Sequence, residues 1–241
     1  MTGKAAMENR LFRARYQNLS QGHVTPLIAE QRTLSTWINS YMWLLRSPHY
    51  NELFLQHYRL IDGTIHVDFS YGTGWDTPDA IKEKFRWLFE KKHRGEHVHF
   101  KVFPISLMKR GFEEDLVEYL SGYKVLTIKR SPLDTFLSFS YQQQTGWKRP
   151  HRKIHHEPLE DVMYHVHENV MRKWCESHRY TRKFISGLDV LHEFDADNID
   201  DLELEDFFET KSQLMTRPMD IDYPSLIENY EEVEKYIREN V

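Results

Sequence analysis

The stretch KVLTIKRSPLDTFLSFSYQQQ, residues 124–144, decides the fold. It begins with the apolar run VLTI, and a continuous run of this kind is typical of a strand buried on both faces of a parallel sheet. Arg130 follows shortly after the run, and Pro132 suits the first turn of a helix because its φ angle is already fixed. The stretch therefore predicts a strand, a sharp turn and a helix, with a cationic side chain at the turn.

The same alternation of strand and helix extends over the rest of the chain. Hydrophobic periodicity and Gly, Pro and Ser signals predict these elements. The predicted strands are 23–30, 97–107, 123–129 and 188–194, with 53–61 and 64–70 as further candidates. The predicted helices are 35–45, 77–93, 112–122, one from 132, 159–179, 200–209 and 223–240. This order predicts an α/β three-layer sandwich, a central parallel sheet with helices on both faces.

Length and composition predict one domain at 23–241, preceded by an N-terminal extension at 1–22. The chain has 241 residues, 40% of them hydrophobic, without a continuous apolar run long enough to span a membrane. The extension lacks the apolar core of a secretory signal, and the single Cys175 excludes an internal disulfide. A formal net charge of −5 disfavours a nucleic-acid partner. We expect a soluble, cytoplasmic protein with no membrane partner.

Ligands of parallel α/β sheets bind beyond the carboxyl ends of the strands, so the strand-to-helix turns are the places to search. In QRTLSTW, residues 31–37, Arg32 and the hydroxyls of Thr33, Ser35 and Thr36 gather where a helix begins. Unpaired backbone N–H groups, the helix dipole and a cation together form a cradle for an anion. The alternative is that Ser35 or Thr36 only caps the helix.

The turn at Arg130 is the second place of this kind. A guanidinium at a strand end presents several donors to a phosphate, and Ser138 lies eight residues further along the predicted helix. The alternative is that Arg130 forms a structural ion pair with Asp134 and that Ser138 is an ordinary helix residue. Taken together, the two turns favour a binding site for phosphate groups.

These two motifs resemble those of the sulfotransferases that use 3′-phosphoadenosine 5′-phosphosulfate (PAPS). QRTLSTW is similar to the family's 5′-phosphosulfate loop, and RSPLDTFLS is similar to its 3′-phosphate motif, an arginine followed by a serine eight positions later. The family's lysine-bearing strand is similar to HFKVFPISL. Its late strand, with the acidic turn and helix that follow, is similar to LDVLHEFDADNIDDLELEDFF. The resemblance implies a P-loop-NTPase-like sulfotransferase fold and sulfuryl transfer from PAPS, leaving adenosine 3′,5′-bisphosphate (PAP).

The resemblance also implies roles for individual residues. Arg32 would contact the 5′-phosphosulfate and stabilise charge on the leaving oxygen, and Arg130 with Ser138 would hold the 3′-phosphate. Lys101 would be the lysine of the strand HFKVFPISL and is a further catalytic candidate. The rest of the predicted cofactor loop consists of Thr33, Leu34, Ser35, Thr36 and Trp37.

The chain departs from the family pattern at two positions. Leu34 stands where the family usually has glycine, and Phe103 stands where its cytosolic members place a catalytic histidine. The general base must therefore come from elsewhere, and other branches use a glutamate after the first helix. By position, Glu52 and His57 are preferred here, with His66 and Asp68 as further candidates. Each of the four is alternatively an ordinary surface or packed side chain.

The acceptor is expected to be a small molecule or carbohydrate that offers a hydroxyl or an amine. The basic loop KRPHRK, residues 148–153, either recruits an anionic acceptor or is simply solvated. No metal site is expected, because His165 and His167 would point to different sides of the predicted helix. The alternatives to a sulfotransferase are a P-loop kinase or NTPase, although the glycine-rich loop pattern is missing, and an inactive nucleotide-binding module.

Overall fold

The computed structural model describes residues 24–42, 49–52, 98–105, 117, 120, 123–145, 163–208 and 221–241. Its centre is a five-stranded parallel sheet in the order β2-β3-β1-β4-β5. The strands are β1 (Val24–Ile28), β2 (His49–Glu52), β3 (Val98–Val102), β4 (Val125–Lys129) and β5 (Val190–Asp195). The prediction of an α/β protein with a parallel sheet is therefore confirmed.

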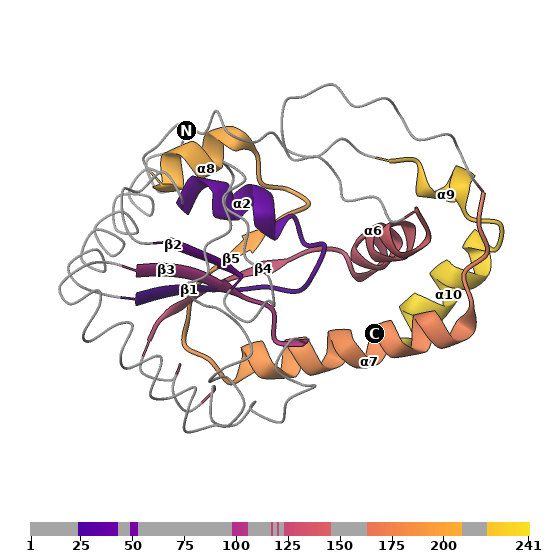
Figure 1. The fold of residues 1–241 in the computed structure, drawn as a ribbon, viewed down its shortest axis with the longest axis horizontal. Coiled ribbons are helices and arrows are strands. Elements are labelled where there is room, and N and C mark those ends of the chain that lie inside the picture. Colours follow the sequence, from indigo (N-terminus) through magenta and orange to yellow (C-terminus); the bar gives the residue numbers. More distant parts are fainter. Residues whose placement is uncertain are drawn as a thin grey trace, which may run out of the picture.

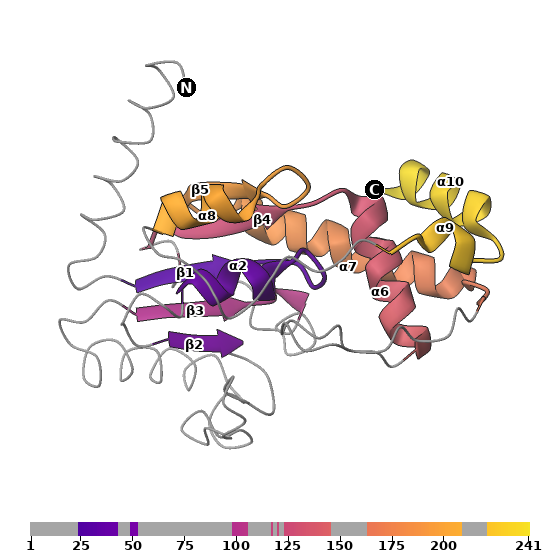
Figure 2. The ribbon, with the colours of Figure 1, turned by 90° about the horizontal axis from the view of Figure 1, so that it is seen from above.

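Helices cover both faces of the sheet. On one face lie α2 (Ser35–Met42) and α8 (Asp201–Phe208), and on the other lies the long helix α7 (Glu168–Ser186) (Figures 1 and 2). A third group lies beyond the carboxyl ends of the strands: α6 (Pro132–Thr145), α9 (Tyr223–Leu226) and α10 (Tyr230–Asn240). Helix α7 runs from under the sheet to this third group. Of the described helices, none is long and apolar enough to cross a membrane.

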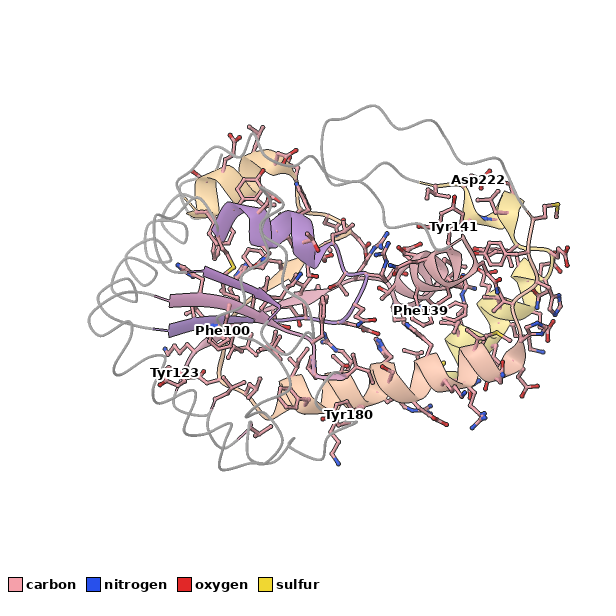
Figure 3. All side chains as sticks on the ribbon, in the orientation of Figure 1. Phe100, Tyr123, Phe139, Tyr141, Tyr180 and Asp222 are labelled. Carbon is pink, nitrogen blue, oxygen red and sulfur yellow. The ribbon has the colours of Figure 1, made fainter. Side chains whose placement is uncertain are left out.

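Two apolar clusters hold these elements together. The sheet core joins strands β1, β4 and β5 to helices α2 and α8, and its buried residues are Leu27, Ala29, Trp37, Ile38, Tyr41, Met42, Phe103, Leu126, Ile128, Phe194, Ala196, Ile199, Leu204 and Phe208. The helical core joins α6, α7, α9 and α10, and its buried residues are Phe136, Leu137, Tyr164, Val166, Met171, Trp174, Cys175, Tyr223, Leu226, Ile227, Val233 and Ile237. Figure 3 shows Tyr141 of α6 beside α9, where its ring lies 6.0 Å from that of Tyr223.

Helix α6 begins where the sequence predicts. Ser131 caps it, because its hydroxyl accepts a hydrogen bond from the N–H of Asp134 at 3.3 Å, three residues later. Pro132 is the first residue of the helix. The strand, turn and helix predicted from residues 124–144 are thus confirmed.

The predicted helix 159–179 is wrong at residues 163–167. Tyr164 and Val166 are buried while His165 and His167 are exposed, and this alternation belongs to an extended chain. Tyr164 pairs with Ile227 in a parallel bridge, and α7 starts only at Glu168. The two histidines consequently lie on one side, with ring centroids 5.4 Å apart, rather than pointing apart.

The same pairing interrupts the predicted helix 223–240. The N–H of Glu228 donates to the carbonyl of Tyr164 at 3.0 Å, and the side chain of Asn229 exchanges two 3.0 Å hydrogen bonds with the backbone of Val166. Backbone groups used in this way are unavailable to a continuous helix, so α9 and α10 are separate.

Strand β2 was not predicted, because the short segment HYNE lacks an apolar run. The N-terminal extension, the helix predicted at 77–93, the candidate strands at 53–61 and 64–70 and the basic loop at 148–153 lie outside the described residues. Of the helix predicted at 112–122, only residues 117 and 120 are described, and both are helical.

Candidate functional site

The order of the strands selects one place for a ligand. Strand β1 lies between β3 and β4, and the chain leaves β1 toward β2 on one side and leaves β4 toward β5 on the other. Two adjacent parallel strands whose connections depart in opposite directions open a crevice beyond their carboxyl ends. Two segments lie at this crevice: the loop after β1 (residues 29–34) and the turn after β4 (residues 130 and 131). Each contains one of the arginines predicted from the sequence to bind an anion.

The loop after β1 has an unusual backbone. Arg32 and Leu34 have positive φ angles of 71° and 59°, in the left-handed region that side chains other than glycine rarely adopt. Leu34 thus takes the conformation for which glycine is the usual choice, and its side chain packs against the sheet core. The carbonyl of Leu34 accepts hydrogen bonds from Trp37 and Ile38, which starts α2. The N–H groups of Ser35 and Thr36 belong to the first turn of α2, whose amides have no acceptor within the helix itself.

The two predicted motifs contact each other directly. The Nε of Arg32 donates to the Oγ of Ser138 on α6 at 3.3 Å. The Nη1 of Arg130 donates to the backbone carbonyl of Arg32 at 3.0 Å. Residues separated by about a hundred positions are thereby brought to one edge of the sheet.

Arg130 takes a partner that the sequence did not indicate. Its Nε lies 3.5 Å from an oxygen of Asp197, and the other oxygen of Asp197 accepts from the N–H of Ser131 at 2.6 Å. The suggested ion pair with Asp134 is therefore replaced by one with Asp197, in the turn after β5. In the sequence, the signal for this partner is an acidic residue just after the predicted strand 188–194. Within the described part of the chain, the contact of the buried Arg130 Nε with Asp197 is an ion pair without hydrogen-bond geometry.

Lys101 is a third cation near the start of α2. It lies on β3 and is fully buried, with its Nζ 3.4 Å from the Oγ1 of Thr36 and 4.9 Å from the centre of the Phe103 ring. In the sheet register, Lys101 pairs with Leu27 of β1 and with Glu52 of β2. The backbone of one base candidate, Glu52, is thus next to that of the lysine. His57, His66 and Asp68 lie outside the described residues.

The other predicted loop residues have mainly structural contacts. The hydroxyl of Thr33 is buried and donates to the carbonyl of Glu30 at 2.8 Å, and Ser35 is also buried. The indole of Trp37 is fully buried and donates to Asp201 at 3.1 Å, so its side chain belongs to the sheet core. The groups of this loop that can contact a ligand are its backbone amides and the side chains of Thr36 and Arg32.

A buried pair beside the loop was also missed. The Nδ1 of His178 on α7 lies 2.7 Å from the Oε2 of Glu30, and the two side chains are only 10% and 11% exposed. Glu30 follows β1 directly, and an acidic residue at the end of a buried strand was the signal for it. The described residues include no group of three His, Cys, Asp or Glu side chains arranged to hold a metal ion.

The arrangement concentrates positive charge. Three cationic side chains, Arg32, Arg130 and Lys101, lie near the amino end of α2. Lys101 is fully buried, and the side chain of Arg130 is 10% exposed and pairs with Asp197. Cations and free amides placed in this way favour an anionic ligand with more than one charged group. Comparison with protein-family models and with curated proteins found no match for this chain.

Proposed function

We propose that the chain is a sulfotransferase of P-loop-like fold that binds PAPS between the loop after β1 and the turn after β4. The proposal rests on the direct contact of the two motifs: Arg32 donates to Ser138 at 3.3 Å, and Arg130 donates to the carbonyl of Arg32 at 3.0 Å. The acceptor is a hydroxyl or amine of a small molecule or carbohydrate.

The donor set fits such a nucleotide. A bisphosphorylated nucleoside presents two separate anionic groups, and the site presents two guanidinium groups from different loops. The Nε of Arg130 lies 3.5 Å from Asp197 without forming a hydrogen bond to it in the described residues, so the guanidinium can still donate to a phosphate oxygen. Arg130 and Ser138 are assigned to the 3′-phosphate, and Arg32 with the amides of Ser35 and Thr36 to the 5′-phosphosulfate.

Bound PAPS supplies an activated sulfuryl group, and the protein contributes position and charge. Arg32 and the first-turn amides of α2 stabilise negative charge that develops on the leaving oxygen, as in phosphoryl transfer. Lys101, held beside Thr36, adds a buried positive charge from the neighbouring strand. A general base removes the acceptor proton, and Glu52, next to Lys101 in register, and His57 are the candidates.

Calorimetric titration with PAP tests this proposal. We expect wild-type protein to bind PAP with ~micromolar affinity, and Arg130→Ala to lose about 2 kcal/mol or more, or ~30-fold in affinity. The matched control is Arg172→Ala, which removes an exposed arginine that pairs with Glu176 one helical turn away. This control should bind like wild type.

Three other outcomes separate the alternatives. Binding of ATP with magnesium but not of PAP would favour the kinase or NTPase. Binding of PAP without turnover of PAPS on a broad acceptor panel would favour an inactive nucleotide-binding module. Absence of binding by folded wild-type protein would overturn a nucleotide site at this edge.

A further inference from the structure

The loop after β1 is held by two helices that belong to the helical core. Helix α6 reaches the loop through Ser138, which accepts from the Nε of Arg32. Helix α7 reaches it through His178, whose Nδ1 is 2.7 Å from the carboxylate of Glu30. The first contact joins two residues of the candidate site. The second joins two residues that have no part in the proposed chemistry.

Glu30 is tied to the loop by its backbone as well as by its side chain. Its carbonyl accepts from the Oγ1 of Thr33 at 2.8 Å, which closes the turn that precedes α2. A displacement of Glu30 would therefore move the segment that contains Arg32. Because the carboxylate is buried, loss of its partner would leave a poorly solvated charge, and the loop would have to move to hydrate it.

His178 is itself firmly placed. Its ring stacks on Trp174, with centroids 5.0 Å apart and planes 24° from parallel. Trp174 in turn contacts Phe136 of α6 edge to face, with centroids 5.3 Å apart. The imidazole is thus an extension of the helical core that ends in a hydrogen bond to the loop.

We infer that His178 is a positioning residue that fixes the anion-binding loop through Glu30. It holds the carboxylate and thereby the turn formed by residues 30–34, so that the helical core sets where Arg32 and the first amides of α2 stand. Its effect on nucleotide affinity rests on the proposed function, whereas its effect on the loop does not.

Hydrogen exchange of the backbone amides of residues 31–38, measured without nucleotide, tests the inference. Among them, the amides of Trp37 and Ile38 donate to the loop carbonyl of Leu34 and report on its position. In His178→Leu, which lacks a donor, we expect exchange in this loop to accelerate by about tenfold or more, as for loss of a hydrogen bond to a charged group. His178→Asn retains an N–H near the position of Nδ1 and should restore most of the protection. Rescue by Asn would show that the hydrogen bond matters rather than the ring.

Met171→Ala is the matched control. Met171 is a fully buried residue of the same helix and belongs to the helical core, so its truncation destabilises the protein without removing a contact to the loop. Loop exchange should then change no more than exchange in the strands of the sheet. If His178→Leu fails to fold, Glu30→Gln, which preserves the shape of the side chain, serves as the second variant and should also accelerate loop exchange.

Titration with PAP gives the second readout. We expect His178→Leu to bind PAP about tenfold more weakly than wild type, and Met171→Ala to bind as wild type does. Unchanged loop exchange in folded His178→Leu, or equal acceleration in Met171→Ala, would overturn the inference. Failure of wild-type protein to bind PAP would overturn the proposed function instead, because the exchange result does not depend on nucleotide.

Discussion

The sheet core and the helical core differ in how their residues reach one another. The sheet core joins strands and helices from both ends of the chain, from Leu27 to Phe208, around a parallel sheet. The helical core uses the later part of the chain, from Phe136 to Ile237, and packs helix on helix. Both are apolar inside, and the contacts that join them at the candidate site are polar.

This difference shows where function can reside. Apolar packing keeps each core in one arrangement, whereas the boundary between them carries arginines, a serine and the Glu30–His178 pair. Arg32 and Arg130 come from the sheet side, and Ser138 and His178 come from the helical side. A ligand bound to the loop would therefore contact groups whose positions depend on both cores.

The largest expected effect comes from truncating one aromatic residue in each core. Phe194→Ala and Phe136→Ala both remove fully buried rings, and each should reduce the free energy of unfolding by about 3–5 kcal/mol. Because α7 runs under the sheet and into the helical core, we expect one cooperative transition in each variant. Urea unfolding followed by circular dichroism and by tryptophan fluorescence should give coincident curves. Separate transitions would show that the two cores unfold independently.

A smaller effect is expected at the turn that supports Arg130. Asp197→Ala removes the acceptor of the Ser131 N–H and the partner of the guanidinium, and it should cost about 1.5 kcal/mol of stability. Thermal and chemical unfolding measure this loss. Glu176→Ala removes the partner of exposed Arg172, and it should change stability by less than about 0.5 kcal/mol. Equal effects of the two substitutions would mean that the Asp197 contacts are no stronger than a surface ion pair.

The backbone of the loop predicts an inverted order of stability at position 34. Leu34→Ala and Leu34→Gly both remove the side chain that packs on the sheet core, but only alanine keeps a Cβ at a φ of 59°. The glycine variant should therefore be the more stable by about 1 kcal/mol. At Ser35, the first residue of α2, the ordinary order is expected, so Ser35→Ala should be more stable than Ser35→Gly. Comparison of the four unfolding midpoints checks both signs.

The smallest effect is a pH dependence in the turn after β5. The pKa of Asp195 is lowered from its ordinary value of 3.8, first by the hydrogen bond from Asn198 and then by the N–H of Asp197 and by Lys129. Because the folded pKa is the lower one, the stabilisation is complete above the ordinary value and is lost as the pH falls below it. Asp195→Asn should flatten this acid-side loss slightly.

Unfolding at a series of pH values from about 6 to about 3 measures the effect of Asp195. Asp222→Asn, which removes an exposed carboxylate near the start of α9 in Figure 3, is the comparison variant for the loss of one surface charge. An identical profile for wild type and Asp195→Asn would show that the turn does not depend on the charge.

Local patterns were sufficient for most of the described elements and failed where tertiary pairing competes with them. The buried run before Arg130 and the start of α6 at Pro132 are local signals, and both predictions are confirmed. Local pattern predicts that residues 163–167 belong to the helix 159–179. The bridge between Tyr164 and Ile227, some sixty residues later, makes this segment extended instead.

The candidate site divides in the same way. Arg32, Arg130 and Ser138 could be selected from the sequence, because cations and hydroxyls at strand-to-helix turns have one common chemistry. Asp197, Glu30 and His178 could not be paired with them, because each acts through a partner distant in the chain. The φ angles of Arg32 and Leu34 were equally hidden, since neither residue type signals a left-handed backbone.

The sequence by itself determined the parallel α/β class, the turns that carry cationic side chains, and the start of α6, because these depend on neighbouring residues and on hydrophobic periodicity. Only the tertiary structure decided that β1 and β4 are adjacent, that Arg32 contacts Ser138, and that α7 reaches the loop through His178. The physical reason is that strand order and helix packing follow from burying apolar surface over the whole chain, which no local pattern encodes.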